Sequence, residues 1–202
     1  MRLLLHTPTH PFCQMCLDTW PDRFGVLLTP ASGYRVDRWP GHFLAADNGC
    51  YQRPADDKFV GFARHFSTRA AWVVLPDVVG DAVASREMSL MWRERLEGEG
   101  IKANWAWVLQ DGFDIEQLPE GINCLFLGGT TEYKLSREAR DTLIWGREQG
   151  YYIHVGRVNT ERRIKRFEAI ADSADGTNFA RWVTNPTTRR IMRRHAEQMR
   201  LI

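Results

Sequence analysis

The stretch "ANWAWVLQDGFDIEQLPEGINCLFLGG" (residues 103–129) decides the fold class of this chain. It holds two short apolar runs, 103–112 and 123–129, and each run ends in polar or glycine residues. Neither run alternates apolar with polar residues, and together they are rich in Val, Leu and aromatic side chains. Such runs are typical of strands that are buried on both faces of a parallel sheet.

Similar runs recur along the chain, separated by longer amphipathic segments. We expect six further strands, at residues 2–8, 24–30, 42–49, 70–77, 151–158 and 171–177. Helices are predicted over 80–97, from Ser136 to about Gln149, from Asn159 or Thr160 to about Ile170, and over 187–200.

Eight strands that alternate with helices predict a single α/β domain over residues 1–202, a compact (β/α)8 TIM-like barrel with a basic C-terminal helix. A length of 202 residues lies at the lower limit for this fold, so some helices must be short or missing. A flat, doubly wound sheet is the alternative architecture.

The composition is that of an ordinary globular protein, with 44% hydrophobic and 26% charged residues. No apolar run approaches the roughly 18 residues that span a bilayer. The opening "MRLLLHTPTHPF" is too soon interrupted by His and Pro for a signal peptide. Four cysteines without a secretion signal indicate reduced thiols, so we expect a cytoplasmic protein with no membrane partner.

Charge is distributed unevenly along the chain. From Arg157 onward there are eleven Lys and Arg against five Asp and Glu, whereas the preceding part has sixteen against twenty. A basic C-terminal quarter on an acidic body favours an anionic partner, with nucleic acid first. The alternative is that these arginines coat solvated helix faces.

Polar residues follow the predicted strands, where a barrel of this kind gathers its catalytic groups. They are Asp47-Asn48-Gly49, Asp77, Gln110-Asp111-Gly112, Gly128 to Glu132, His154 to Arg157, and Asp175-Gly176-Thr177. Asp and Gly are also common turn formers, so turn chemistry is the alternative for any one of them. Together they suit a flat heterocycle such as guanine, whose donors would bind Asp77 and whose acceptor edge would bind Gln110 and the Gly129 amide.

A resemblance rests on an ordered set of motifs. These are "LAADNGCYQ" (44–52), "VVLPDVVGD" (73–81), "WVLQDG" (107–112), "LFLGGTTE" (125–132) and "IHVGRVNTERRIKRFEAIADSADGT" (153–177). The set, which runs from about Phe24 to Ala180, resembles the tRNA-guanine transglycosylase superfamily. It is most similar to the short, phage- and bacteria-associated branch called "deoxypurine in DNA" protein A, whose members act on DNA.

The resemblance implies roles for individual residues. Asp175 matches the nucleophile, and Asp47 matches an acid that accepts a proton near the incoming base. Asp172 matches a nearby structural acid. Substrate-binding positions implied by the motifs and strand ends are Asn48, Asp77, Gln110, Gly128, Gly129, Thr130 and His154, the last of which is equally well read as a core histidine.

The chain also departs from the tRNA enzymes. They carry a zinc site of three cysteines and a histidine after the nucleophile, and no cysteine follows Cys124 here. The motif at Asp47 reads Asn-Gly-Cys in place of Ser-Gly-Gly. The absence of this zinc site favours the DNA-directed branch over tRNA as substrate, whereas the change in the motif at Asp47 concerns the fine geometry of the site.

The expected activity is therefore exchange of guanine in DNA for a 7-deazaguanine base through a covalent aspartyl–sugar intermediate. It needs no metal or redox cofactor, although a helper protein could open the duplex. Rival interpretations are a tRNA-directed exchanger, a base hydrolase and a non-catalytic nucleic-acid-binding barrel. The residues expected to grip phosphate are Arg157, Arg162, Arg163, Lys165, Arg166, Arg189 and Arg190, with Arg193 and Arg194 extending the surface.

Other groups of residues in the sequence suit different chemistry. His6, His10, Cys13 and Cys16 offer a set of zinc ligands, although there is no second CxxC, and buried thiols with turn residues are the alternative. Cys50 lacks an evident histidine partner for a nucleophile. Trp39 and Trp182 offer rings for base stacking.

Overall fold

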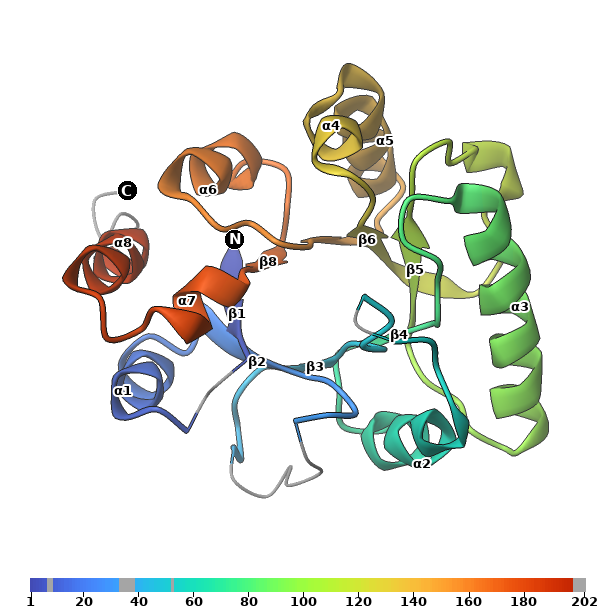
Figure 1. Ribbon diagram of the computed structural model, residues 1–202, viewed down its shortest axis with the longest axis horizontal. Coiled ribbons are helices and arrows are strands. Elements are labelled where there is room, and N and C mark those ends of the chain that lie inside the picture. Colours follow the sequence, from blue (N-terminus) through green and yellow to red (C-terminus); the bar gives the residue numbers. More distant parts are fainter. Residues whose placement is uncertain (7–8, 33–38, 52, 198–202) are drawn as a thin grey trace.

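Eight parallel strands close into a barrel in which each strand pairs with the next along the chain and the last pairs with the first (Figure 1). This computed structural model describes residues 1–6, 9–32, 39–51 and 53–197. The strands are β1 (Arg2–Leu5), β2 (Phe24–Leu28), β3 (Leu44–Ala46), β4 (Val73–Val74), β5 (Trp105–Leu109), β6 (Ile122–Leu127), β7 (Tyr152–Val155) and β8 (Ser173–Asp175). The predicted barrel is confirmed and the flat sheet is excluded. Seven strands lie within their predicted runs, and β6 begins one residue earlier.

Helices surround the barrel (Figure 1). They are α1 (Pro11–Thr19), α2 (Asp57–Phe66), α3 (Ala82–Gly98), α4 (Thr131–Leu135), α5 (Arg137–Glu148), α6 (Glu161–Phe167), α7 (Thr177–Arg181) and α8 (Pro186–Glu197). Only the short 3-10 helix η2 (Ile115–Gln117) links β5 to β6, so one connection is abbreviated as expected. In the part of the chain that the structure describes, no helix is both long enough and apolar enough to cross a membrane.

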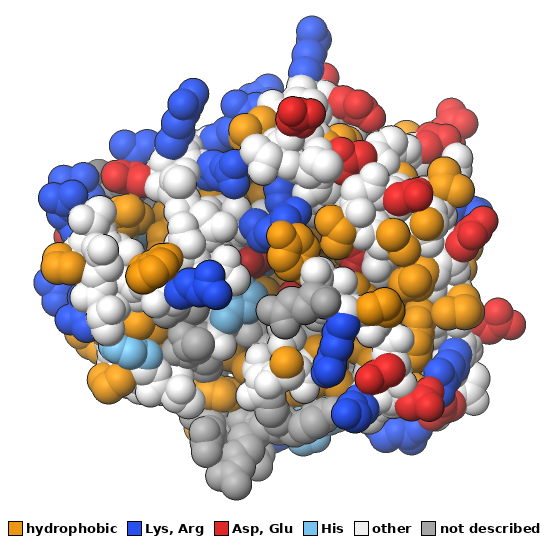
Figure 2. Space-filling model, viewed as in Figure 1, with side chains coloured by type: hydrophobic (Ala, Val, Ile, Leu, Met, Phe, Trp, Pro, Cys, Tyr) orange, Lys and Arg blue, Asp and Glu red, His pale blue; other side chains and the backbone are white. Residues whose placement is uncertain are grey.

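The predicted helices correspond to α3, α5, α6 and α8. Ser136 and Thr160 cap α5 and α6 as expected, because their side chains accept hydrogen bonds from the N–H groups of Ala139 and Arg163. The helix predicted to reach Ile170 ends at Phe167. For the basic helix predicted over 187–200, residues 198–200 lie outside the described part. Figure 2 shows Lys and Arg side chains gathered on the side of the molecule formed by α6 and α8.

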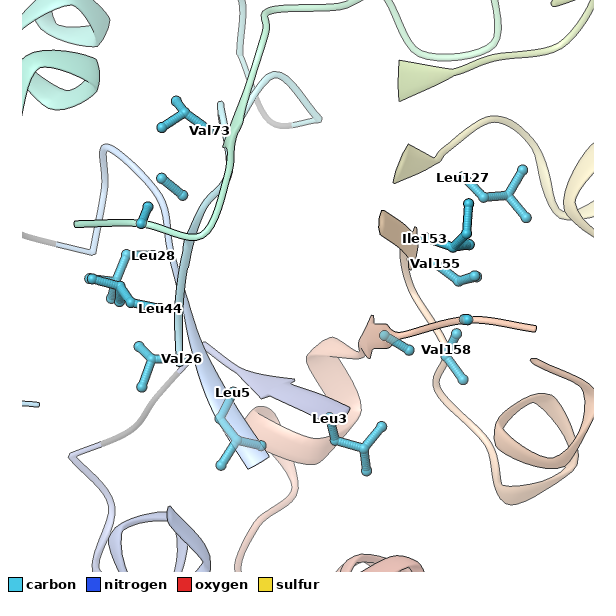
Figure 3. Close-up of a cluster of buried hydrophobic side chains, with 14 of the residues drawn as sticks. Leu3, Leu5, Val26, Leu28, Leu44, Val73, Leu127, Ile153, Val155 and Val158 are labelled. Carbon is cyan, nitrogen blue, oxygen red and sulfur yellow. The ribbon is translucent and has the colours of Figure 1, made fainter. Parts of the chain in front are cut away.

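Two hydrophobic layers explain why the strands have uninterrupted apolar runs. Leu3 and Leu5 of β1 point outward to the helices, as do Val26 and Leu28 of β2 (Figure 3). Leu4, which lies between Leu3 and Leu5, belongs instead to a separate cluster inside the barrel. The members of that inner cluster are Leu4, Leu27, Ala45, Trp72, Val74, Ala106, Val108, Cys124 and Phe126. Since successive side chains of a strand point to opposite faces, both faces of each strand are buried.

Candidate active site

A pocket of about 580 Å³ opens where the strands end. The pocket wall is formed by residues at or just beyond the ends of the strands, each two positions after an inward-facing residue of the barrel. They face inward as well, because successive side chains of a strand point to opposite faces. Asp47 follows Ala45 in this way, and Gln110 follows Val108. The inward-facing set around the wall is His6, Thr29, Asp47, Gln110, Gly128, Gly156 and Asp175. The volume is of the size that holds a small heterocyclic ligand.

Asp175, at the end of β8, is held by two histidines. Its Oδ1 lies 3.1 Å from His6 Nε2, and its Oδ2 lies 3.1 Å from His154 Nε2. The backbone N–H of Arg157 also donates to Oδ2, over 3.3 Å. A carboxylate only accepts hydrogen bonds, so both Nε2 atoms carry the proton. The other ring nitrogen of His154 lies 2.7 Å from the Ser173 hydroxyl, which fixes the histidine ring.

These contacts keep Asp175 ionised. Burial favours the neutral acid, but the hydrogen bonds from His154 and His6, together with the attraction of the two histidines, hold the pKa of Asp175 well below its usual range. Burial also opposes the charged form of His6, yet the hydrogen bond and charge of Asp175 raise the pKa of His6. For His154 burial prevails and lowers the pKa. The pocket wall therefore presents a fixed carboxylate, which can act as a nucleophile.

Asp47, just beyond the end of β3, lines the same pocket, and its pKa is shifted in the opposite direction to that of Asp175. Burial, followed by the negative charge of Asp175, raises the pKa of Asp47 to about 6. Its Oδ1 accepts a hydrogen bond from Gly49 N–H over 3.3 Å. Two carboxyl groups in one cavity thus differ in protonation, so Asp175 is a stable anion while Asp47 exchanges a proton near neutral pH.

A buried polar network on the β4 and β5 side positions Asp77. Its Oδ1 accepts from Asn48 Nδ2 over 2.7 Å, and its Oδ2 accepts a short bond from Gln110 Nε2. Gln110 Oε1 in turn accepts from Gly80 N–H over 2.8 Å. Burial raises the pKa of Asp77, although the bonds from Asn48 and Gln110 act against this. The network holds a hydrogen-bond acceptor at a fixed place in the pocket wall.

Asn48, predicted to bind substrate, is used inside the protein. Its amide donates to Leu75 O as well as to Asp77, both over 2.7 Å, and its Oδ1 accepts from Cys50 N–H over 2.8 Å. It is also buried. We therefore expect Asn48 to orient Asp77 rather than to donate to a ligand.

Gly128 and Gly129 bring backbone to the pocket surface, as expected. A Cβ atom at Gly128 would lie 2.6 Å from Val108 Cγ1 and 2.9 Å from Gln110 Nε2. Gly129 has a φ of +75°, and its carbonyl accepts a hydrogen bond from the Arg157 guanidinium. A side chain at either position would disturb the network around Gln110 or the turn after β6.

Two predicted substrate-binding residues do not line the pocket. The N–H and hydroxyl of Thr130 both bind the Asp111 carboxylate, because Thr130 is the N-cap of α4, and the next residue, Thr131, faces the pocket instead. His154 is fully buried below Asp175, with its ring 4.8 Å from that of Trp72 and 4.5 Å from that of Phe126. His154 lies deeper in the barrel than the residues of the pocket wall, because β7 continues beyond it to Val155.

Asp172 is placed as a structural acid, in line with the sequence reading. Its Oδ2 accepts from Ile153 N–H over 2.8 Å, and its Oδ1 lies 3.6 Å from the Arg147 guanidinium. It does not line the pocket.

The predicted zinc set does not converge. His6 Nε2 faces Asp175, and His10 Nδ1 accepts from Phe12 N–H to cap α1. Cys13 and Cys16 are buried on α1, where burial raises their pKa values to about 11 and about 12. Among the described residues, no group of three or more His, Cys, Asp and Glu side chains is arranged to hold a metal ion.

The Cys50 thiol is not suited to act as a nucleophile, and the two tryptophans differ in exposure. Burial raises the pKa of Cys50 to about 11, so its thiol is protonated and a poor nucleophile. Trp39 is buried in the core, whereas Trp182 is 53% exposed. Trp182 alone of these two offers a free ring face.

The predicted phosphate-gripping residues form two groups. Arg157 and Arg163 line the pocket itself. Arg162, Lys165 and Arg166 lie exposed on α6, with Lys165 3.8 Å from Glu161 and Arg166 donating to Leu135 O. A second hollow, of about 490 Å³, is lined by Arg189, Arg190, Arg193 and Arg194 of α8 together with Thr184, Pro186 and Glu197.

Three residues that line the pocket were not among the catalytic or substrate-binding residues predicted from the sequence. His6 was assigned only to a zinc set, although its place two residues after the inward-facing Leu4 predicts an inward side chain. Tyr51 is 67% exposed at the pocket, with the Arg157 guanidinium 4.5 Å from its ring centre. Lys134 is only 5% exposed, and a lysine next to a predicted helix start gives no signal of burial.

Comparisons with known proteins bear on the fold. No protein-family description matches the chain, and no curated protein matches its sequence. Among solved structures, the chain is similar to the crystal structure of KGPDC from Streptococcus mutans, with a TM-score of 0.54 and 13% identity. The match covers 86% of this chain and 85% of that one. At this identity the likeness concerns the architecture, and it agrees with the closed barrel of eight parallel strands.

Proposed function

We propose that the protein is a transglycosylase that replaces guanine in DNA by a 7-deazaguanine base through a covalent aspartyl–sugar intermediate. The observation that carries the proposal is the pairing of Asp175, held as an anion by two histidines, with Asp47, whose pKa is raised to about 6, in the wall of one pocket. The resemblance of the motifs around both residues to transglycosylases supports the same activity.

The network around Asp77 supplies the groups that a guanine ring needs. Asp77 would accept from N1–H and the exocyclic amine with the lone pairs that Asn48 and Gln110 leave free. The second N–H of the Gln110 amide and the N–H of Gly129, which has no hydrogen-bond partner within the described part of the chain, would donate to O6. A purine that presents donors where guanine has O6 would leave these N–H groups unpaired, which disfavours adenine.

In the first half-reaction, Asp175 attacks the sugar C1′ of the target nucleotide. Its Oδ1 is the attacking atom, since Oδ2 is held from behind by His154 and the Arg157 N–H. A bond forms between C1′ and Oδ1, the C1′–N9 bond breaks, and its electron pair leaves with guanine. Asp47 in its protonated form gives the proton that neutralises the departing base.

In the second half-reaction, the incoming base occupies the vacated pocket. Asp47, now ionised, takes the N9 proton of that base, and the N9 electron pair forms the new bond to C1′. The C1′–Oδ1 bond then breaks and Asp175 returns to its anionic form. The two displacements at one carbon parallel those of retaining glycosidases.

The target nucleotide must leave the base stack to reach this pocket, at a cost of a few kcal/mol. Arg157 and Arg163 line the pocket, so they are placed to hold phosphate beside an extruded nucleotide. The arginine-lined hollow on α8 extends the basic surface beyond the pocket.

The test offers DNA and tRNA in parallel, each with 7-cyano-7-deazaguanine, and analyses the nucleosides by mass spectrometry. Incorporation into DNA supports the proposal, incorporation only into tRNA identifies the tRNA-directed rival, and abasic sites without incorporation identify a base hydrolase. Asp175→Asn should abolish incorporation while DNA binding is retained. Asp141→Asn, on the exposed face of α5, is the matched control and should exchange normally.

If wild-type protein leaves both nucleic acids unchanged while binding DNA, the protein is a binding barrel without this activity. Full incorporation by Asp175→Asn would remove the nucleophile from the mechanism.

A further inference from the structure

Lys134 is a buried cation in the pocket wall that the proposed reaction does not use. It lies on α4, lines the pocket and is 5% exposed. Its ammonium donates to Gly156 O over 3.3 Å, and this is its only hydrogen bond within the described ranges. An ammonium has three N–H donors, so two remain to bind a ligand.

The surroundings of Lys134 are basic. The Arg157 guanidinium donates to Gly129 O, and Arg163 donates to Arg157 O over 3.3 Å. Burial, followed by the charge of Arg157, lowers the pKa of Lys134 to about 8, so at neutral pH most molecules keep this lysine charged. The acids whose charges act on Lys134, Asp175 and Asp111, are already bound by the histidines and by Thr130.

The pocket is therefore polarised. Asp77 and Asp47 lie on the side of β3 and β4, whereas Lys134, Arg157 and Arg163 lie beyond the ends of β6 and β7. The turn formed by Gly128 and Gly129 separates the two sides, because Gly128 abuts Gln110 and the Gly129 carbonyl binds Arg157.

This polarity orients a base, given the proposed function. With its N1–H and amine on Asp77, guanine or 7-deazaguanine turns O6 toward Gln110 and Gly129. A substituent on C7 shares the edge that carries O6, so it extends past the glycine turn toward α4 and the end of β7. Lys134 is the buried donor in that direction.

We propose that Lys134 selects the incoming base by its C7 substituent, accepting groups that receive a hydrogen bond, such as a nitrile, carboxamide or carboxylate, and excluding a cationic aminomethyl group. This inference rests on the proposed function. An acceptor would complete the hydrogen bonding of a buried ammonium, whereas a second cation would lie beside Lys134 and Arg157 without a free counter-ion.

The experiment measures kcat/KM for four incoming bases with one DNA substrate. Isotopically labelled guanine reports base exchange itself, unsubstituted 7-deazaguanine gives the baseline without a C7 group, and the 7-cyano and 7-aminomethyl derivatives report the selection. The wild-type protein should prefer the 7-cyano base over the 7-aminomethyl base by at least about tenfold, one buried charge–charge contact being worth a pKa unit or more.

Two variants of Lys134 distinguish its attraction for the 7-cyano group from its repulsion of the cationic aminomethyl group. Lys134→Met keeps the length of the side chain without charge and should bring the two substituted bases to within about threefold of each other. Lys134→Glu should reverse the preference, because a carboxylate attracts the ammonium of the aminomethyl group. Lys102→Met, exposed before β5 and so at the opposite end of the barrel, is the control and should keep the wild-type ratio.

The outcomes distinguish the two proposals. If wild-type protein fails to exchange labelled guanine, the proposed function itself is wrong. If labelled guanine is exchanged but the two substituted bases react equally, or the Lys134→Met variant keeps the wild-type ratio, the role of Lys134 is wrong. If the Lys134→Glu variant loses both guanine exchange and its melting transition, it does not fold. The ratio of kcat/KM for the 7-cyano and 7-aminomethyl bases, measured for Lys134→Met, then tests the role of Lys134.

Discussion

His154 donates a hydrogen bond from Nε2 to Oδ2 of Asp175 over 3.1 Å, from a ring that has no exposed surface. His6 approaches the other oxygen of the same carboxylate from the pocket side, with 19% of its side chain exposed. The two histidines thus have different tasks. His154 anchors the carboxylate to the interior, and His6 holds the oxygen that faces a ligand.

Replacing the two histidines by alanine should separate stability from activity. His154→Ala leaves the Ser173 hydroxyl and Asp175 Oδ2 short of a partner and opens a cavity between Trp72 and Phe126, so we expect a loss of about 3 kcal/mol in unfolding free energy. His6→Ala should lose less than about 1.5 kcal/mol, because water can replace a partly exposed donor. Urea denaturation measures both values.

In activity, His6→Ala should lower kcat by roughly tenfold to a hundredfold, the range expected for a displaced reacting group. His6→Gln carries an amide N–H near the position of Nε2, so it should recover part of the lost rate. Equal stability losses for the two alanine variants, or no recovery in His6→Gln, would contradict this division of roles.

Asp47 should make the free energy of unfolding depend on pH in a direction opposite to that of an ordinary paired carboxylate. Its pKa is raised from 3.8 to about 6, so the folded protein binds the proton more tightly than the unfolded chain. Stability from this group is present at low pH and is lost as the pH rises through about 6. Asp47→Asn mimics the protonated form, and it should match the wild type near pH 4 and exceed it by roughly 2 to 3 kcal/mol at pH 7.5.

The same variant should lose exchange activity, since an amide cannot take the N9 proton. For the wild type, kcat/KM for the DNA substrate should fall as the pH rises through about 6, because the first half-reaction uses protonated Asp47. Thermal or urea unfolding across pH, together with the rate profile, measures both effects. A variant whose stability advantage is the same at pH 4 and pH 7.5 would show that Asp47 does not titrate as described.

Gly128→Ala should damage the base-recognition network with little effect on the nucleophile. The added methyl would lie 2.6 Å from Val108 Cγ1 and 2.9 Å from Gln110 Nε2, so the bond from Gln110 to Asp77 must shift. We expect KM for the base to rise at least about tenfold and stability to fall by about 1 to 3 kcal/mol.

Gly61→Ala is the comparison for this substitution. Gly61 lies inside α2, and a Cβ atom there meets no atom within 4 Å. It should stabilise the protein by about 0.5 to 1 kcal/mol and leave KM unchanged, because alanine favours helix more than glycine does. An unaltered KM in Gly128→Ala would show that Gln110 is not needed where the network places it.

Arg163→Gln should weaken DNA binding without changing its sequence preference. A residue that contacts one phosphate contributes about 0.9 to the slope of log K against log salt, so the slope should fall by about that amount. The double change Arg189→Gln and Arg190→Gln should lower it further if the hollow on α8 lies on the path of the backbone. Arg137→Gln, whose side chain is 93% exposed on α5, should leave the slope unchanged. Fluorescence anisotropy at several salt concentrations gives each slope.

The barrel could be predicted because strands with two buried faces leave a strong trace in sequence. The run around Trp107 is apolar at every inward and outward position of β5, and the run around Phe126 is apolar throughout β6 except at Asn123. Helices with common caps, such as Ser136 and Thr160, were also found. The sequence interpretation missed α1 and α2, and α1 is capped by His10, a residue that is not a usual N-cap. It also missed α4 and α7, each of five residues, which are too short to show a helical period.

Within the pocket, the predicted residues Asp47, Gln110 and Asp175 were found because polar side chains directly after apolar runs stand out. How deep in the barrel a side chain lies was harder to predict from the sequence. Thr130 does not line the pocket as predicted, and of the two interpretations of His154 the structure agrees with the core histidine. The position of each residue depends on where β7 ends and where α4 begins, and a shift of one residue turns a side chain to another face. The burial of Lys134 arises from tertiary packing against Gly156 and Arg157, which leaves no periodic pattern.

The inner cluster that packs the barrel below the pocket determines the order in which guanine leaves and the incoming base binds. Trp72, Val108 and Phe126 fill the interior beneath the pocket, so this end of the pocket is sealed. Two bases cannot pass each other in such a dead end, and the outgoing one must depart by the route through which its successor arrives. Steady-state rates measured against both substrates should therefore follow ping-pong kinetics, with free guanine competing directly against the incoming base.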